Sequence, residues 1–172
     1  MKEYYGTKRI AALLMTRLAY NEYRGWNLPS DENGADEGYL VEYQDGGAGN
    51  HPDHTGYISW SPKAQFEAAY QPINAMSFGH AIAALKAGER VARAGWNGKS
   101  MWLVLVPGST GLTVEEGRPL AKAGLPIGTR FDYLPHIDMW TAQGNFVPWL
   151  ASQTDMLADD WMIVTADQAA AA

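Results

Sequence analysis

The chain has 172 residues, of which 47% are hydrophobic and 19% are charged, and its formal net charge is −6. This length and apolar content predict one folded domain or two small ones rather than a disordered chain. The acidic balance argues against a general DNA- or RNA-binding protein, and the lack of cysteine excludes disulfides, thiol catalysis and cysteine-ligated zinc.

No apolar run in the sequence is long enough for a membrane span, and the first residues are too polar for a signal peptide. We therefore expect a cytoplasmic protein. Seven tryptophans and nine tyrosines are many for this length. Rings in this number indicate a ligand site or a subunit interface in addition to a core.

The first half of the chain predicts two helices and two strands. Residues 7–23 form the clearest helix candidate, because their apolar side chains recur at roughly helical spacing and Thr7 can cap the start. Apolar runs at 39–43 and 57–60 predict short strands. A second helix is expected over residues 62–70, with proline at its favoured first position.

Two imidazoles and a carboxylate lie close together at His51, Asp53 and His54, with Asp45 nearby. Such a cluster would hold a divalent metal if a further ligand came from elsewhere in the chain. No distant ligand of clear type is evident, so the alternative is a polar loop tied by local hydrogen bonds. We expect no metal and no cofactor.

The central stretch predicts a short helix followed by a hairpin. Ser77 is a suitable N-cap, and Gly88 stops the helix. Strands at 90–96 and 99–106 flank Asn97-Gly98, the strongest short-range signal for a type I′ hairpin turn.

A turn centred on Asn97-Gly98 also predicts a register. It pairs Arg93 with Trp102, and it places Trp96 on the same face as Leu103. Trp102 then lies on the opposite face, where it is either core or stacks on Arg93 through a cation–π contact.

The remaining elements complete the predicted fold. Residues 107–130 are rich in Gly and Pro and predict a long loop. A second hairpin is expected from 133–140 and 146–150, then a helical turn at 152–158 and a strand at 161–164. The sequence therefore indicates an α+β protein: a small antiparallel β-sheet domain with short helices, preceded by a small α+β N-terminal module.

Trp96 and Trp149 each lie beside polar residues, as a nucleotide site requires. The polar neighbours are Asn97, Ser152, Thr154 and Asp155. An aromatic face stacks on a base, whereas hydroxyls and amides orient the ribose and phosphates. In a chain of negative net charge, Arg93 or Lys99 would supply the local positive charge for a phosphate. The alternative is that both rings belong to the core.

A hydrolytic site is the competing interpretation of the same region. His136 and Asp138 lie two residues apart and therefore on one face of a strand. With Ser152 or Thr154 they would compose a hydrolase triad, yet no nucleophile elbow accompanies them. We interpret His136 as a hydrogen-bonded structural residue and expect no enzymatic activity.

Three segments carry a family resemblance, and they occur in that family's order and spacing. They are SFGHAIAALKAGERVARAGWNGK, LPHIDMWTAQGNFVPWLASQTD and the closing DDWMIV. Over residues 76–164 the chain resembles the second Thoeris anti-defence family, small phage proteins that act as sponges for nucleotide immune signals.

This resemblance implies a small α+β domain that assembles into homotetramers. It also implies that the protein captures glycocyclic ADP-ribose signals, made by TIR enzymes of the Thoeris defence, without cleaving them; some members also hold cyclic dinucleotides. The family's aromatic walls fall on Phe78, Trp96 and Trp149 of this chain. With their polar partners and Arg93, the expected ligand-binding residues are Phe78, Arg93, Trp96, Asn97, Trp149, Ser152, Thr154 and Asp155.

The N-terminal half resembles a different family of small phage proteins, one without a known activity, through GWNLPSDENGADEGYLVEY and NHPDHTGYISWSPKAQFEAAY. The seam around Pro72 and the start-like Met76 predict two modules, 1–72 and 73–172. Two rival hypotheses remain: a phage nucleotide phosphodiesterase that uses His51, Asp53 and His54, and a structural or interaction module.

Overall fold

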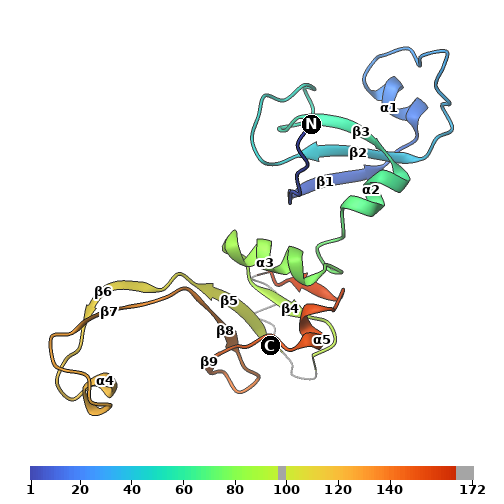
Figure 1. Ribbon diagram of the computed structural model, residues 1–172. Helices are drawn as coiled ribbons and strands as arrows, with labels where there is room; N and C mark the ends of the chain where they lie inside the picture. The colour runs from blue at the N-terminus through green and yellow to red at the C-terminus, as the bar shows by residue number, and fades with distance from the viewer. Residues whose placement is uncertain (97–99, 166–172) are drawn as a thin grey trace. The chain divides into compact units, whose positions relative to one another are not determined.

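Figure 1 shows a computed structural model of the protein, which describes residues 1–96 and 100–165. The chain divides into two compact units, Met1–Gln71 and Pro72–Ala172. Both are built from antiparallel sheets and short helices, which confirms the α+β class. Within the two described ranges, no helix combines the length and the apolar character needed to cross a bilayer.

The N-terminal unit is a three-stranded antiparallel sheet with two helices. The sheet has the order β1-β2-β3, with bounds Ile10–Leu14, Gly38–Tyr43 and Ile58–Pro62. The helices are α1 (Arg17–Tyr23) and α2 (Lys63–Ala69). The core consists of Tyr20, Leu40 and Ile58, with Met15 and Trp60 packed against it. Both predicted strands of this half are confirmed, and Pro62 lies at the N-cap of α2 instead of inside the helix.

The predicted helix over 7–23 is wrong in its first half. Residues Ile10–Leu14 form β1, which pairs with Tyr39–Tyr43 of β2, and the helix begins only at Arg17. Its cap is Thr16, whose side chain accepts a hydrogen bond from the Ala19 N–H at 3.3 Å. A five-residue apolar run fits either a strand or a helix, and here pairing with β2 decides between them.

The C-terminal unit is built on a five-stranded antiparallel sheet of order β10-β4-β5-β8-β9. The strands are β4 (Val91–Arg93), β5 (Trp102–Val106), β8 (His136–Trp140), β9 (Phe146–Pro148) and β10 (Trp161–Ile163). The second predicted hairpin is confirmed as β8 and β9. The closing strand is confirmed as β10. It pairs with β4, so the last strand of this sheet in chain order lies beside the first.

Helix α3 (Phe78–Lys86) packs on this sheet, and its boundaries agree with the prediction. Ala81 and Leu85 are buried on the sheet side, against Val91, Leu103 and Trp161. Ser77 occupies the N-cap, but its hydroxyl lies 3.0 Å from His80 Nδ1 and makes no capping bond to the backbone.

The predicted register of the central hairpin is wrong by one residue. Val91 pairs with Leu103, and both side chains are fully buried under α3. Trp102 therefore lies on the other face, where Arg90 and not Arg93 stands over its ring at 5.0 Å. Strand β4 ends at Arg93, and the Ala94 N–H bonds to Asp160 O at 3.0 Å, which continues the pairing with β10 by one residue. The predicted Asn97-Gly98 turn lies outside the described residues.

The predicted loop over 107–130 is also wrong, because this segment has its own secondary structure. Strands β6 (Ser109–Thr113) and β7 (Arg130–Tyr133) form a separate two-stranded ribbon, with the short helix α4 (Pro119–Lys122) between them. Glycine can adopt a positive φ, as at Gly111, where φ is +70° and the register of β6 against β7 shifts.

The C-terminal unit is expected to fold without the N-terminal unit when the fragment begins at Pro72. Ile73 O accepts a hydrogen bond from the Ile163 N–H at 2.9 Å, which secures β10. A fragment that begins at Met76 loses this bond and should be less stable by about 0.5–1.5 kcal/mol. Chemical denaturation followed by tryptophan fluorescence measures both fragments, and an insoluble Pro72 fragment would show that the two units fold only together.

Candidate functional site

Four aromatic rings meet at one end of the C-terminal sheet. Phe78 begins α3, Trp96 follows β4, Trp149 follows β9 and Trp161 begins β10. The Trp161 ring is fully buried, whereas the other three are half-buried around it. We call this set the aromatic cluster.

The rings of the aromatic cluster pack mainly edge to face. The centroids of Trp96 and Trp149 lie 5.6 and 6.0 Å from that of Trp161, with interplanar angles of 77° and 81°. Phe78 lies 5.4 Å from Trp161 at 41°. Aromatic pairs prefer such offset or T-shaped contacts. Trp161 therefore acts as a rigid base that holds three partly exposed rings.

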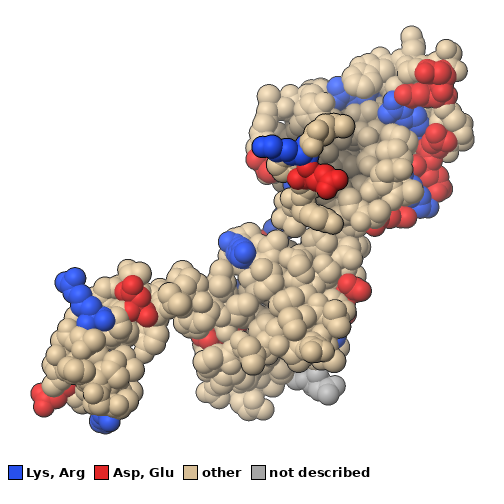
Figure 2. Space-filling model, viewed as in Figure 1, with Lys and Arg blue, Asp and Glu red and all other residues tan. Residues whose placement is uncertain are grey.

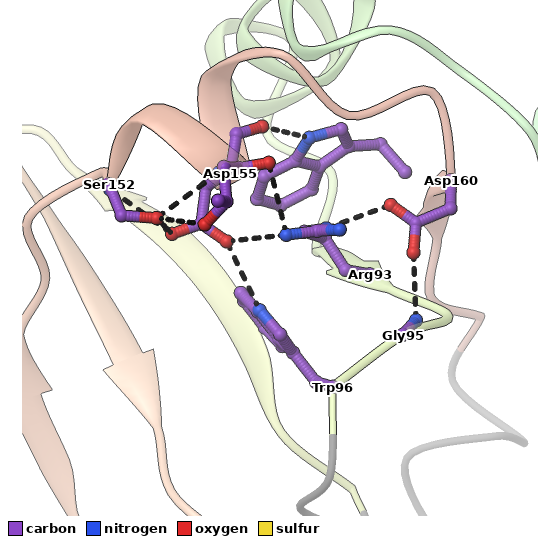
Figure 3. A network of polar contacts seen from close by, with 8 residues as sticks. Arg93, Gly95, Trp96, Ser152, Asp155 and Asp160 are labelled. Atoms are coloured by element: carbon purple, nitrogen blue, oxygen red, sulfur yellow. Dashed lines mark hydrogen bonds and ion pairs between the residues drawn. The ribbon is translucent and has the colours of Figure 1, made fainter.

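A polar network adjoins the aromatic cluster and links three elements (Figure 3). The Arg93 guanidinium on β4 donates to Asp155 Oδ1 on α5 and to Asp160 Oδ1 before β10, each at 2.8 Å. Asp160 Oδ2 also accepts from the Gly95 N–H at 2.8 Å. A Cβ at position 95 would lie 2.9 Å from this oxygen, so glycine permits the close approach.

Asp155 is the centre of the network. Besides Arg93, its carboxylate accepts from the Ser152 hydroxyl at 2.6 Å and from the Trp96 indole N–H at 3.4 Å. Ser152 and Asp155 together form a capping box at the start of α5 (Gln153–Met156), and the Ser152 and Thr154 hydroxyls lie 2.8 Å apart. The carboxylate therefore orients Trp96 and fixes α5 at the same time.

The electrostatics of the network differ from those of an open phosphate site. Burial by itself would raise the pKa of Asp155, but hydrogen bonds from Ser152 and Arg93 outweigh it and lower the pKa to about 2. Hydrogen bonds to Asp160 and Asp155 raise the pKa of Arg93. One guanidinium against two carboxylates leaves a net negative charge, so Arg93 orients its neighbours and does not add positive charge to the surface.

The depressed pKa of Asp155 predicts a loss of stability in acid. In the unfolded chain this carboxyl titrates near 3.8, and in the folded protein near 2. Its contribution, at most about 2 kcal/mol, is complete above pH 4 and disappears as the pH falls toward 2. Asp155→Asn should be less stable at pH 7, and its difference from the wild type should shrink over this window. Thermal melts between pH 2 and 7 measure this, and a constant difference would contradict it.

Seven of the eight predicted site residues lie in or beside the aromatic cluster. Phe78, Trp96 and Trp149 supply the partly exposed rings, and Arg93, Ser152, Thr154 and Asp155 compose the adjoining network. The eighth, Asn97, lies outside the described residues. Ser152 and Thr154 are exposed and offer hydroxyls at the edge of the rings.

Two residues at the centre of this arrangement were not among the sequence-based candidates. Trp161 is the ring on which the others pack, and Asp160 holds both Arg93 and Gly95. In the sequence, the one local sign of these contacts is the pair of aspartates, Asp159 and Asp160, before the last strand. Its meaning depends on the pairing of Trp161 with Arg93 across β10 and β4, which spacing along the chain does not reveal.

The histidine clusters of the sequence are held by local contacts. In the N-terminal unit, His54 bonds to Glu42 at 2.8 Å and to Tyr23 at 2.9 Å, and His51 stacks on Tyr23. In the C-terminal unit, His136 Nδ1 lies 2.9 Å from Leu134 O. Among residues 1–96 and 100–165, no group of three or more His, Asp or Glu side chains is arranged to hold a metal.

Comparison with known proteins identifies the family of the segment that contains the aromatic cluster. Residues 76–164 match the Thoeris anti-defense 2-like domain. The chain is also similar to Thoeris anti-defense 2 of Bacillus phage SP01, with 38% identity over 91 residues. This alignment covers 52% of the chain and 96% of the phage protein. All four rings of the aromatic cluster and the whole polar network lie inside the matched segment.

Proposed function

The chain belongs to the Thoeris anti-defense 2-like family, and from this premise we propose that it captures glycocyclic ADP-ribose immune signals without cleaving them. A phage protein of this kind blocks Thoeris immunity by lowering the concentration of free signal. Its place of action is the cytoplasm of the infected host cell, and cyclic dinucleotides are a second ligand class of similar chemistry.

One observation carries this function: three partly exposed rings pack around a buried tryptophan beside exposed hydroxyls. Phe78, Trp96 and Trp149 offer surface on which an adenine can stack. Ser152 and Thr154 offer hydroxyls that suit a ribose. The rings are held by the core and by Asp155, so little conformational entropy is lost when a ligand binds.

The phosphates require a different part of the site. Arg93 is already paired with two carboxylates, and the net negative charge of the network disfavours a phosphate beside it. Backbone N–H groups and cations farther from Asp155 or on a second subunit therefore meet the phosphates. The base and ribose lie on the rings and hydroxyls.

The absence of cleavage is part of the same proposal. Asp155 and Asp160, the carboxylates beside the rings, are held by Arg93, Ser152 and the Gly95 N–H. A general base must be within reach of a substrate proton and able to accept it. The strongly lowered pKa of Asp155 makes it a weak base, and its bonds suit a structural role.

A thermal-shift panel tests the binding. Glycocyclic ADP-ribose, cyclic ADP-ribose and cyclic dinucleotides are each added to the full chain. A ligand at about 100 times its Kd adds about 2.7 kcal/mol to the free energy of unfolding, because it binds only the folded state. A clear rise in melting temperature with a cyclic ADP-ribose-type nucleotide supports the proposal, and no rise with any of the panel would refute it.

We also expect a homo-oligomer, most simply a homotetramer. Leu150 and Leu157 lie on either side of α5 and are 91% and 81% exposed, and Phe146 is 52% exposed. Figure 2 shows few charged side chains over the face that carries α3 and the sheet. Apolar surface of this kind is typical of subunit interfaces. Light scattering should give four times the 18.9 kDa of one chain, and a monomer mass at micromolar concentration would contradict the expectation.

The rival function is a nucleotide phosphodiesterase that uses His51, Asp53 and His54. The bonds of His54 to Glu42 and Tyr23 favour a structural role for this loop. Release of cleaved nucleotide from the full chain, abolished by His54→Gln, would favour the enzyme instead.

A further inference from the structure

The N-terminal unit contains a cavity of about 250 Å³ that is partly open to solvent. It is lined mainly by apolar side chains of β1 and β2, with polar groups contributed by three residues. The lining residues are Ala11, Ala12, Leu13, Met15, Tyr23, Leu40, Glu42 and His54.

The cavity follows from the composition of the edge strand. Ala11 pairs with Glu42 and Leu13 pairs with Leu40, so these four side chains share one face of the sheet. The inner strand is well covered there, with Leu40 only 5% exposed, whereas Leu13 is 61% exposed. The short side chain of Ala11 leaves the space on this face unfilled.

The polar end of the cavity is an ordered chain of hydrogen bonds. The Glu42 carboxylate accepts from the Gly56 N–H at 3.0 Å and from the Thr55 hydroxyl at 3.3 Å, and it lies 2.8 Å from His54 Nδ1. These hydrogen bonds, that of His54 first, lower the pKa of Glu42. An ionised carboxylate only accepts, so the His54 proton lies on Nδ1.

This tautomer determines what the cavity offers to a ligand. In the neutral imidazole, His54 Nε2 is an acceptor, and the Tyr23 hydroxyl, 2.9 Å away, donates to it. The lone pairs of the Tyr23 oxygen remain available to a donor. The Tyr23 ring is itself fixed by stacking on His51, with the centroids 4.5 Å apart. The polar end therefore favours N–H or O–H donors, and the charge of Glu42 opposes anions.

We propose that this cavity binds a small, mainly apolar molecule of one or two rings that carries one N–H or O–H donor and no negative charge. An enclosed cavity of about 150 Å³ accommodates benzene, so this larger and partly open space has room for a bicyclic ring. Its walls are aliphatic, and its polar end is an acceptor.

Indole is the probe, and methyl NMR on the full chain is the measurement. Met15 lines the cavity, and its labelled methyl signal, assigned through Met15→Leu, should shift saturably as indole is added. The methyl signals of Met139 and Met162 in the C-terminal unit should not move. Indole-3-acetate has the same ring with a negative charge and should bind at least tenfold more weakly.

Two variants and a control separate cavity binding from surface adsorption. Ala11→Phe fills the space and should weaken indole binding more than tenfold, whereas Ala68→Phe on exposed α2 should leave it unchanged. Tyr23→Phe keeps the ring and removes the acceptor oxygen, so binding should weaken about three- to tenfold. An unshifted Met15 signal at the solubility limit of indole, equal binding of indole-3-acetate, or unchanged binding by Tyr23→Phe would overturn the proposal.

Discussion

Trp161→Ala is expected to lower the free energy of unfolding of the C-terminal unit by about 3–5 kcal/mol, the usual cost of truncating a buried aromatic. The side chain is fully buried, and three other rings pack on it. Its indole N–H donates to Asp155 O at 2.9 Å, a bond that the variant also loses. Denaturant unfolding followed by circular dichroism measures the change.

Trp102→Ala is the matched control for this loss. Trp102 is also on the sheet, but on its other face, where it is half-buried and stacks on Trp140 at 5.9 Å. Truncation of Trp102 should lower the free energy of unfolding clearly less than truncation of Trp161. The Trp102 side chain is partly exposed, so solvent can fill the space that it leaves beside Trp140. An equal loss in both variants would show that Trp161 is not the base of the aromatic cluster.

Trp96→Ala is expected to weaken binding of glycocyclic ADP-ribose by about 1–3 kcal/mol, the range for one base–aromatic stack. This corresponds to roughly tenfold to over a hundredfold in Kd. Stability should fall as well, because the ring packs on Trp149 and Trp161, but by less than in Trp161→Ala, since Trp96 is only half-buried. Calorimetry of the folded variant measures the binding separately from the stability.

The comparison with two further variants makes the test specific. Trp96→Phe keeps a stacking face and loses the N–H bond to Asp155, so it should retain most of the affinity. Trp102→Ala changes the opposite face of the sheet and should bind normally. If Trp96→Ala bound as tightly as the wild type but melted far lower, Trp96 would be a core residue and not part of the ligand site.

Much of the fold could be predicted where the signal is local. Ser77, Gly88 and the second hairpin identified their elements, since caps and turns depend on neighbouring residues. Strand β1 was predicted as helix, because an apolar run of five residues becomes a strand only through its pairing with β2. The register of β4 and β5 failed for a related reason. Strand β4 lies between β5 and β10, and its pairing with β10, which is distant in sequence, cannot be recognised from the hairpin pattern.

In the candidate site, too, local motifs could be predicted from the sequence, whereas contacts between distant residues could not. Ser152, Thr154 and Asp155 are close in sequence, and their capping motif could be recognised there. The contribution of Arg93 was interpreted from its charge alone as a phosphate contact. Its two carboxylate partners lie more than sixty residues away, and only the sheet order brings them together. Trp161 was recognised as a strand residue, but its burial depends on rings from three other elements.

The most direct test of signal capture is recovery of the nucleotide. The full chain is incubated with glycocyclic ADP-ribose, washed free of unbound ligand and denatured by heat, and the released nucleotide is identified by mass spectrometry. Capture without cleavage predicts that intact glycocyclic ADP-ribose is recovered in stoichiometric amount, and that Trp96→Ala retains much less. Recovery of cleavage products, or of no nucleotide at all, would contradict it.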